Sequence, residues 1–311
     1  MRHGWAPIAV LCAACYQPAV SPGAPCGPAG ECPSGLICQA GACVVPGTVL
    51  DDAGLGADAP VDTPVAIDAP IDAAPLGPWG PATEITLTVG GESDPSMSAD
   101  LRVMVFMSEN DDDLYGGVRA TPTGTMAVTK LVVLNSGSNE KSPELSPDAH
   151  TLYFTSSRDG DYDVYVSTFT TNWGAPTRVA ELSTSDDDSD VAISPDGLTA
   201  IVIVNTTTNT FAFHTRASTS EPWGPRVDHP ELSVGTDPGA PTLTNDGAVV
   251  YFHRGGTRDL YVAYKQASGT YTAPVPVDEL NTGGRDAAPF VLGNNRHIVF
   301  EHEADIYEAS R

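Results

Sequence analysis

The feature that most constrains the fold is an internal repeat that runs from residue 79 to the C-terminus with a period of 48 to 50 residues. Three ladders share this period. The first has an anchor residue near the start of an apolar run, at Pro95, Pro143, Val191, Pro241 and Pro289. The second is a tripeptide that reads Asp, apolar residue, Tyr in four units and Thr-Phe-Ala in the third. It begins at Asp113, Asp163, Thr210, Asp259 and Asp305. The third has a large side chain, at Trp79, Met126, Trp173, Trp223 and Tyr271. Three ladders in one register predict a repeat architecture.

Each repeat contains four short runs of β-forming residues separated by Gly, Asp, Asn and Pro. In the second unit these runs are "SPELS", "TLYFTS", "DVYVSTF" and "TRVAEL", and no segment has a convincing helical stripe. Four antiparallel strands per period of this length are typical of a propeller blade, whereas a β-helix needs a much shorter repeat. The chain is therefore predicted to be all-β.

The strand count predicts how the ring closes. Five copies of the inner three strands follow Glu92, and the fifth ends with the chain at "ADIYEASR", without an outer strand. One spare strand, "PATEITLTV", precedes the first copy. If it completes the last blade, no sheet edge stays unpaired. We predict a five-bladed β-propeller of four-stranded blades over residues 78–311.

The N-terminus reads "MRHGWAPIAVLCAAC", with one Arg and an apolar run too short to span a bilayer. It predicts a signal peptide over residues 1–14. Ala13, Ala14 and Cys15 resemble the end of a bacterial lipobox, although Cys12 stands where Leu is usual. Cleavage and lipidation at Cys15 leave four cysteines, an even number that can pair. The alternative is a plainly secreted protein.

Two further segments separate this signal from the repeats. Residues 15–43 hold the lipid anchor and a Cys-rich stretch, in which Cys26, Cys32, Cys38 and Cys43 are expected to form two disulfides. Their spacing lacks the paired C-x-x-C knuckles of zinc sites, and three disulfide connectivities are open. Residues 44–77 are rich in Asp, Ala and Pro and have no periodic apolar face, which predicts a disordered linker.

Composition narrows the function. With 15 Lys and Arg against 40 Asp and Glu, the net charge of -25 repels phosphate backbones, which argues against nucleic acid as a partner. The sequence has no G-x-S-x-G, H-E-x-x-H, phosphate-loop or dinucleotide motif. His150, His253 and His302 are interpreted as loop or strand-end residues. No cofactor is expected.

The stretches "SPDAHTLYFTSSRDGDYDVYV", "SPDGLTAIVIV" and "NDGAVVYFHRGGTRDLYVAYK" resemble the TolB-like, WD-repeat-like propellers of the bacterial cell envelope. The resemblance covers residues 79–311; unit three departs from it at "TNTFAFHT" and unit five at "GNN". It implies a non-catalytic, monomeric platform for protein contacts. We expect an outer-membrane lipoprotein that touches the membrane only through its lipid and binds an envelope protein or a glycan.

An acidic residue precedes each anchor by about three positions, at Glu92, Glu140, Asp188, Asp237 and Asp286. These residues are predicted to form an acidic ring at one mouth of the central channel. The alternative function is a five-bladed glycoside hydrolase or glycan-binding protein that uses this ring. Catalytic carboxyls need different environments, so a catalytic set should differ from one repeat to the next. The near fivefold repetition of these acids therefore favours a structural or partner-binding role. It predicts that the chain is not an enzyme.

One turn of the second repeat has carboxylates at a spacing that a calcium site could use. Asp159, Asp161 and Asp163 alternate along the chain as carboxylates around a hard cation can do. The twelve-residue loop and its terminal Glu are missing, so no metal is expected.

Overall fold

The computed structural model describes residues 37–39, 42–44, 76–233 and 238–311. The chain divides into two units, Met1–Ala69 and Pro70–Arg311. In the first unit β1 (Ile37–Gln39) pairs with β2 (Ala42–Val44) in an antiparallel register that sets Cys38 opposite Cys43. Cys15, Cys26, Cys32 and most of the linker lie outside the described residues, so the signal peptide, lipidation, disulfides and linker stay predictions.

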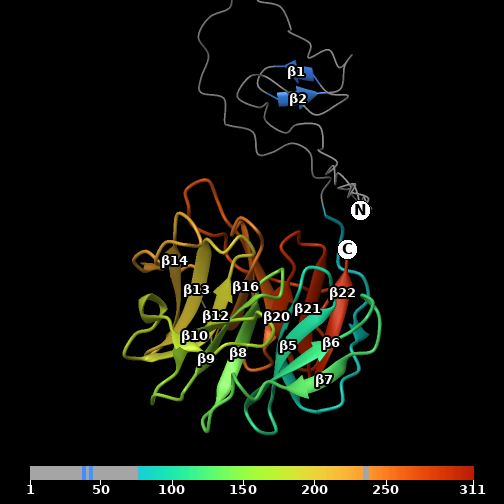
Figure 1. The fold of residues 1–311 in the computed structure, drawn as a ribbon. Coiled ribbons are helices and arrows are strands. Elements are labelled where there is room, and N and C mark those ends of the chain that lie inside the picture. Colours follow the sequence, from blue (N-terminus) through green and yellow to red (C-terminus); the bar gives the residue numbers. More distant parts are fainter. Residues whose placement is uncertain (1–36, 40–41, 45–75, 234–237) are drawn as a thin grey trace, which may run out of the picture. The chain divides into compact units, whose positions relative to one another are not determined.

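The second unit contains five four-stranded antiparallel sheets, each one blade of a propeller (Figure 1). Blade 1 comprises β4 (Glu92–Met97), β5 (Val103–Ser108), β6 (Asp113–Val118) and β7 (Ala127–Lys130). Blade 2 comprises β8 (Glu140–Leu145), β9 (Thr151–Ser156), β10 (Asp163–Thr168) and β11 (Thr177–Arg178). Blade 3 comprises β12 (Asp187–Ile193), β13 (Thr199–Asn205), β14 (Asn209–Thr215) and β15 (Val227–Asp228). Blade 4 comprises β16 (Gly239–Leu243), β17 (Val249–Arg254), β18 (Asp259–Tyr264) and β19 (Val275–Pro276).

Blade 5 closes the ring with strands from both ends of the repeat region. It comprises β20 (Asp286–Val291), β21 (His297–His302), β22 (Asp305–Ser310) and β3 (Thr83–Glu84). The register places Glu84 opposite Tyr307, and the Ile85 N–H donates to the Ile306 carbonyl at 2.8 Å. The predicted five-bladed propeller and its closure by the spare N-terminal strand are confirmed, and only two residues of "PATEITLTV" form the strand.

Apolar side chains fill the space between neighbouring blades, so each sheet buries both of its faces. Five separate clusters of buried side chains lie at the five blade interfaces. At the interface of blades 1 and 2, for example, Leu114 packs with Leu152 and Phe154. The cluster between blades 5 and 1 joins Phe290 and Val299 to Met104 and Phe106. Because every interface carries its own core, the ring is stabilised around its whole circumference.

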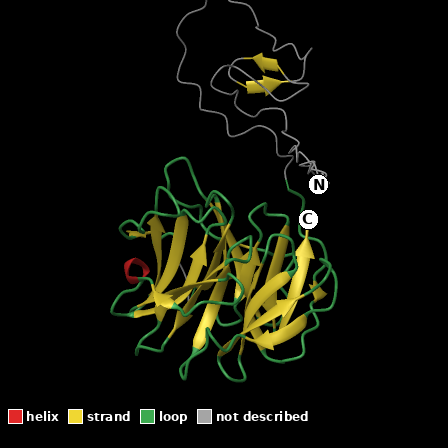
Figure 2. Cartoon of the chain, viewed as in Figure 1, coloured by secondary structure: helices red, strands yellow, loops and turns green. Residues whose placement is uncertain are grey.

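Strands dominate the described part of the propeller, as the repeat predicts (Figure 2). The one helical element there is a 3₁₀ turn, Ala180–Leu182. The turns after the inner strands are held by their own side chains: Ser146 Oγ donates to Asp148 Oδ1 at 2.6 Å, and the Thr151 N–H donates to Ser146 Oγ at 2.8 Å. This confirms a structural role for the Ser-Pro-Asp motif. Within the described residues, no helix is long and apolar enough to cross a membrane.

Candidate functional site: the polar mouth of the channel

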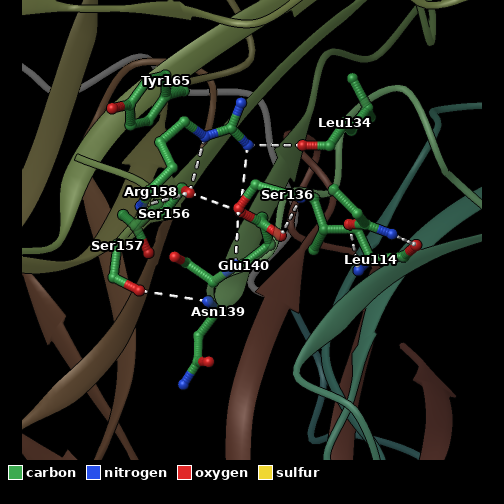
Figure 3. Close-up of polar contacts among 12 residues, drawn as sticks. Leu114, Leu134, Ser136, Asn139, Glu140, Ser156, Ser157, Arg158 and Tyr165 are labelled. Atoms are coloured by element: carbon green, nitrogen blue, oxygen red, sulfur yellow. Dashed lines mark hydrogen bonds and ion pairs between the residues drawn. The ribbon is translucent and has the colours of Figure 1, made fainter. Parts of the chain in front are cut away.

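The repeated acidic residues lie at the starts of the inner strands and are buried there. Glu92, Glu140, Asp188 and Asp286 are at most 3 % exposed, while Asp237 lies outside the described residues. The Glu140 carboxylate accepts hydrogen bonds from the Ser136 N–H at 2.8 Å and the Ser136 hydroxyl at 2.6 Å. It also accepts from the Ser156 hydroxyl at 2.6 Å and from Arg158 at 3.2 Å (Figure 3). Glu140 thus ties the preceding loop to its own blade.

The same arrangement recurs in other blades. Asp188 accepts hydrogen bonds from the N–H and hydroxyl of Thr184, and Asp286 from those of Thr282, in each case four residues earlier. Glu92 accepts from the Gly90 N–H at 2.6 Å. Burial raises the pKa of Asp188 to about 6, although the hydrogen bonds from Thr184 favour the charged form and act in the opposite direction. These carboxylates hold the loops that lead into the strands, and none of the four described is among the residues that line the channel cavities.

The central channel consists of two wide mouths joined by a narrow waist. The waist, with a volume of about 20 Å³, is lined by the anchor ladder itself: Pro95, Pro143, Val191, Pro241 and Pro289. That volume is close to the space of one water molecule. A polar mouth of about 390 Å³ opens on one side and an apolar mouth of about 670 Å³ on the other. The two mouths are therefore separate sites for any larger ligand.

The polar mouth is built on the position just before each anchor, where the fivefold pattern breaks. This position holds Asp94, Ser142, Asp190, Ala240 and Ala288. A register shift interrupts the pairing of each inner strand here. Four of the five residues also have positive φ values, between 44° and 48°. Such bulges re-aim side chains at the rim of a sheet, and only blades 1, 2 and 3 place polar side chains there.

Ser142 links the two carboxylates of this position. Its hydroxyl donates to Asp190 Oδ1 at 2.7 Å and lies 3.5 Å from Asp94 Oδ2, which also accepts from the Ser142 N–H at 3.2 Å. Burial and the Asp190 charge raise the pKa of Asp94 above its ordinary value. Burial opposes ionisation of Asp190 too, but Lys141 and the Ser142 hydroxyl hold its pKa below the ordinary value. Asp94 therefore holds a proton more readily than its neighbour Asp190.

Cationic and neutral donors surround this pair. Lys141, Arg258 and Arg285 line the same cavity, with the Lys141 ammonium 4.1 Å from the centroid of the Tyr162 ring. His253, on β17, is 9 % exposed, and the Ala288 N–H lies 3.3 Å from its Nδ1. Burial lowers the pKa of His253 to about 4 despite the Asp190 charge, so the imidazole is neutral at physiological pH.

A buried carboxylate in blade 5, Glu301, contacts Ser93 and Arg285, two residues that line the polar mouth. Glu301 is fully buried, accepts a hydrogen bond from Ser93 at 2.6 Å and pairs with Arg285, whose Nε lies 2.8 Å from Glu301 Oε1. Arg285 also pairs with the exposed Glu109 at 2.9 Å. Burial raises the pKa of Glu301 to about 7 even though Ser93 and Arg285 favour the charged form. The polar mouth can therefore present both signs of charge, together with hydroxyl and imidazole groups, to a bound molecule.

The acids selected from the sequence stand two residues before the positions that line the polar mouth. They are the carboxylates that repeat, whereas the channel is lined by Asp94, Asp190 and their neighbours, which do not. His253 does lie at a strand end, in the last two residues of β17, but its burial in the polar mouth was not predicted. The signal was present in the sequence, because the residue before each anchor changes from polar to Ala between units three and four.

Two carboxylates of the turn with alternating Asp residues, Asp159 and Asp163, bind protein side chains. Arg178 pairs with Asp163 at 2.6 Å, and the Tyr165 hydroxyl donates to Asp159 at 2.5 Å. Among the residues that the structure describes, no group of three or more His, Cys, Asp and Glu side chains could hold a metal ion.

Comparisons with known proteins return solved structures alone. No family model and no curated protein matches the chain. TolB from Acinetobacter baumannii is 18 % identical over 71 % of this chain and 54 % of that chain, with a TM-score of 0.45. The chain thus spans about half the length of that TolB. A gluconolactonase from Xanthomonas campestris is 14 % identical over 76 % of this chain and 99 % of that chain, with a TM-score of 0.46. The aldose sugar dehydrogenase of Streptomyces coelicolor, in its PQQ-bound form, is 10 % identical over 76 % and 99 %, with a TM-score of 0.43.

These matches bear on two of the predictions. TolB proteins are among the matched structures, so the resemblance to TolB-like propellers is confirmed for the fold. The prediction that the chain is not an enzyme is contradicted, because propellers named as enzymes match it over a similar share of its length. A propeller repeat without a familiar motif does not exclude catalysis, since function belongs to the site rather than to the fold.

Proposed function

We propose that this protein is an exported, lipid-anchored β-propeller that binds a charged segment of an envelope partner protein in its polar mouth. The observation that carries the proposal is the break in symmetry before the anchors, where Asp94, Ser142 and Asp190 face the channel beside Lys141. A cavity of about 390 Å³ is in the range of sites that enclose a small ligand or a few side chains. The predicted lipid on Cys15 and the linker at 44–77 would tether the propeller to a membrane surface.

The charges of the polar mouth favour a charged partner over a neutral sugar. Asp190 and Glu109 offer acceptors for Lys or Arg side chains, and Lys141, Arg258 and Arg285 offer donors to carboxylates. Opposite charges across an interface steer encounter and fix register, and their attraction weakens as salt screens it. Binding of the partner should therefore fall with ionic strength.

Site-specific photo-crosslinking in intact cells tests the proposal. Glu109 is exposed and lines the polar mouth, whereas Val132 is 74 % exposed in the loop after β7. A photoreactive residue at position 109 should yield a discrete crosslinked protein that the same residue at position 132 does not. Equal crosslinking at both positions, or none at position 109, would show that the polar mouth is not the binding surface.

A second candidate function, hydrolysis of a glycan, is favoured by the opposed pKa shifts of Asp94 and Asp190. A carboxyl with a raised pKa beside one with a lowered pKa is the pairing that acid–base chemistry on sugars uses. In a reducing-sugar assay on a glycan panel, Asp94→Asn and Asp190→Asn should each then lower the rate by about 100-fold or more. Glu279→Gln, which removes a charge from an exposed position, should not. Absence of any wild-type activity over the panel would reject this candidate.

A further inference from the structure

The apolar mouth of the channel contains one buried carboxylate, Glu144. This mouth, of about 670 Å³, lies across the waist from the polar mouth and is walled by apolar side chains that include Met97, Ile193, Leu243 and Phe290. Glu144 is 7 % exposed and lines both the mouth and the waist. Burying a carboxylate among apolar groups is costly unless a partner compensates it.

The hydrogen bond that Glu144 makes to the next blade does not require a charged acceptor. Glu144 stands one residue after its anchor, and the Ile193 N–H of the next blade hydrogen-bonds to its carboxylate. At the same position in blade 1, the Ser96 hydroxyl accepts from the Leu145 N–H at 2.6 Å. In blade 4 the Thr242 hydroxyl accepts from the Val291 N–H at 3.2 Å. A neutral hydroxyl makes the same bond between blades, so the carboxylate of Glu144 exceeds what the fold needs.

The cations in the described part of the chain do not compensate Glu144. Burial raises its pKa well above the ordinary value, and the opposing contribution comes from the Ile193 N–H alone. Arg216 lines the same mouth, but it donates to the Gly197 carbonyl at 2.7 Å, and its guanidinium lies 4.0 Å from the Trp223 ring centroid. The acidic side chains Asp148 and Asp196 also line the mouth. No cation of the described residues therefore favours the ionised form of Glu144, and a bound cation would be the first group to do so.

We propose that the apolar mouth binds a small organic ammonium ion, with its charged nitrogen on the Glu144 carboxylate and its apolar body against the surrounding walls. Phe290, which lines the same mouth and waist, adds an aromatic side chain of the kind that attracts ammonium groups. A volume of about 670 Å³ fits a ligand of this size. The ligand enters from the apolar side, because the waist is too narrow to pass it. This site is independent of the polar mouth and of the function proposed for it.

Calorimetric titration of the full chain at neutral pH tests the proposal. The probes are hexylammonium and benzylammonium, with 1-hexanol and benzyl alcohol as neutral counterparts of similar shape. Wild-type protein should bind at least one ammonium ion about tenfold or more tightly than its alcohol. Glu144→Gln, which keeps an acceptor for the Ile193 N–H, should abolish that preference, and Glu279→Gln should preserve it.

A second variant and a thermal-unfolding measurement distinguish loss of the ligand site from loss of the fold. Glu144→Ser copies the residue of blade 1 at this position, so it should fold and should also lose the preference. At neutral pH both Glu144 variants should unfold at a temperature no lower than wild type, because each keeps an acceptor for the Ile193 N–H and avoids the cost of a buried ionisable group. The proposal is overturned if neither ammonium ion binds more tightly than its alcohol, or if the preference survives in Glu144→Gln and Glu144→Ser.

Discussion

The two mouths of the channel are formed by the same five inner strands but differ in chemistry. At the polar mouth, Asp94 and Asp190 lie among Lys141, Arg258 and Arg285, so that charges of both signs converge. At the apolar mouth, Glu144 is a single buried carboxylate among hydrophobic walls. The repeat explains the strands and the turns, which are alike at every blade. The difference between the mouths comes from the few positions that break the repeat, and these are the positions to which we assign binding.

The largest effect is expected at a repeated acid, which should matter for stability rather than for binding. Glu140→Gln removes the charge that compensates Arg158 and weakens the bonds from Ser136 and Ser156. Losing one member of a buried ion pair leaves the other uncompensated, so the free energy of unfolding should fall by about 3 kcal/mol. Urea denaturation measures this change. A loss as small as that of the exposed control Glu279→Gln would mean that the repeated acids are not structural.

The next effect compares the pH dependence of stability at two buried carboxyls, Glu301 behind the polar mouth and Glu144 in the apolar mouth. Burial raises the pKa of Glu301 to about 7 and that of Glu144 well above its ordinary value, so the folded state holds protons that the unfolded chain releases. The contribution of each protonated carboxyl to the free energy of unfolding is fully present below about pH 4.5. This contribution is lost as pH rises through the raised pKa. Arg285, Glu109, Ser93 and Asp94 are the groups that face Glu301.

Glu301→Gln should therefore gain about 3 kcal/mol in unfolding free energy relative to wild type between pH 4.5 and pH 8. Glu144→Gln should shift in the same direction, since its titration has the same sign. Parallel urea melts across this range measure both. If either difference stays flat with pH, that carboxyl ionises in the folded protein as it does in the unfolded chain, and its burial is not the cause that we assign.

Much of the fold could be predicted from the sequence, because a repeat constrains every blade at once. The ladder through Pro95 and Pro143 located the inner strands, and the strand before Glu92 predicted the closure that β3 and β22 form. The candidate site was harder to predict. Glu140 and Asp188 repeat because each binds a Ser or Thr four residues earlier, a local contact that resembles a functional pattern when only the acids are aligned.

The remaining features depend on packing that a linear pattern does not contain. The burial of His253 beside Asp190 follows from strands of two neighbouring blades, and the width of the waist follows from how five anchor side chains meet. Glu144 differs from Ser96 and Thr242 by a charge whose isolation appears only once the walls of the apolar mouth are assembled. Comparing the five units position by position would nevertheless have shown that the residues next to the anchors are the ones that vary.

The central claim is that positions breaking the repeat carry binding, and one measurement tests it most directly. Asp190→Asn removes the ionised carboxylate of the polar mouth, and Glu279→Gln removes the same charge from an exposed position elsewhere on the propeller. With the photoreactive residue at position 109, and at a temperature where both variants are folded, the account predicts that Asp190→Asn lowers the yield of crosslinked partner about fivefold, a change of roughly 1 kcal/mol. Glu279→Gln should leave the yield unchanged. Equal yields from the two variants would contradict the claim.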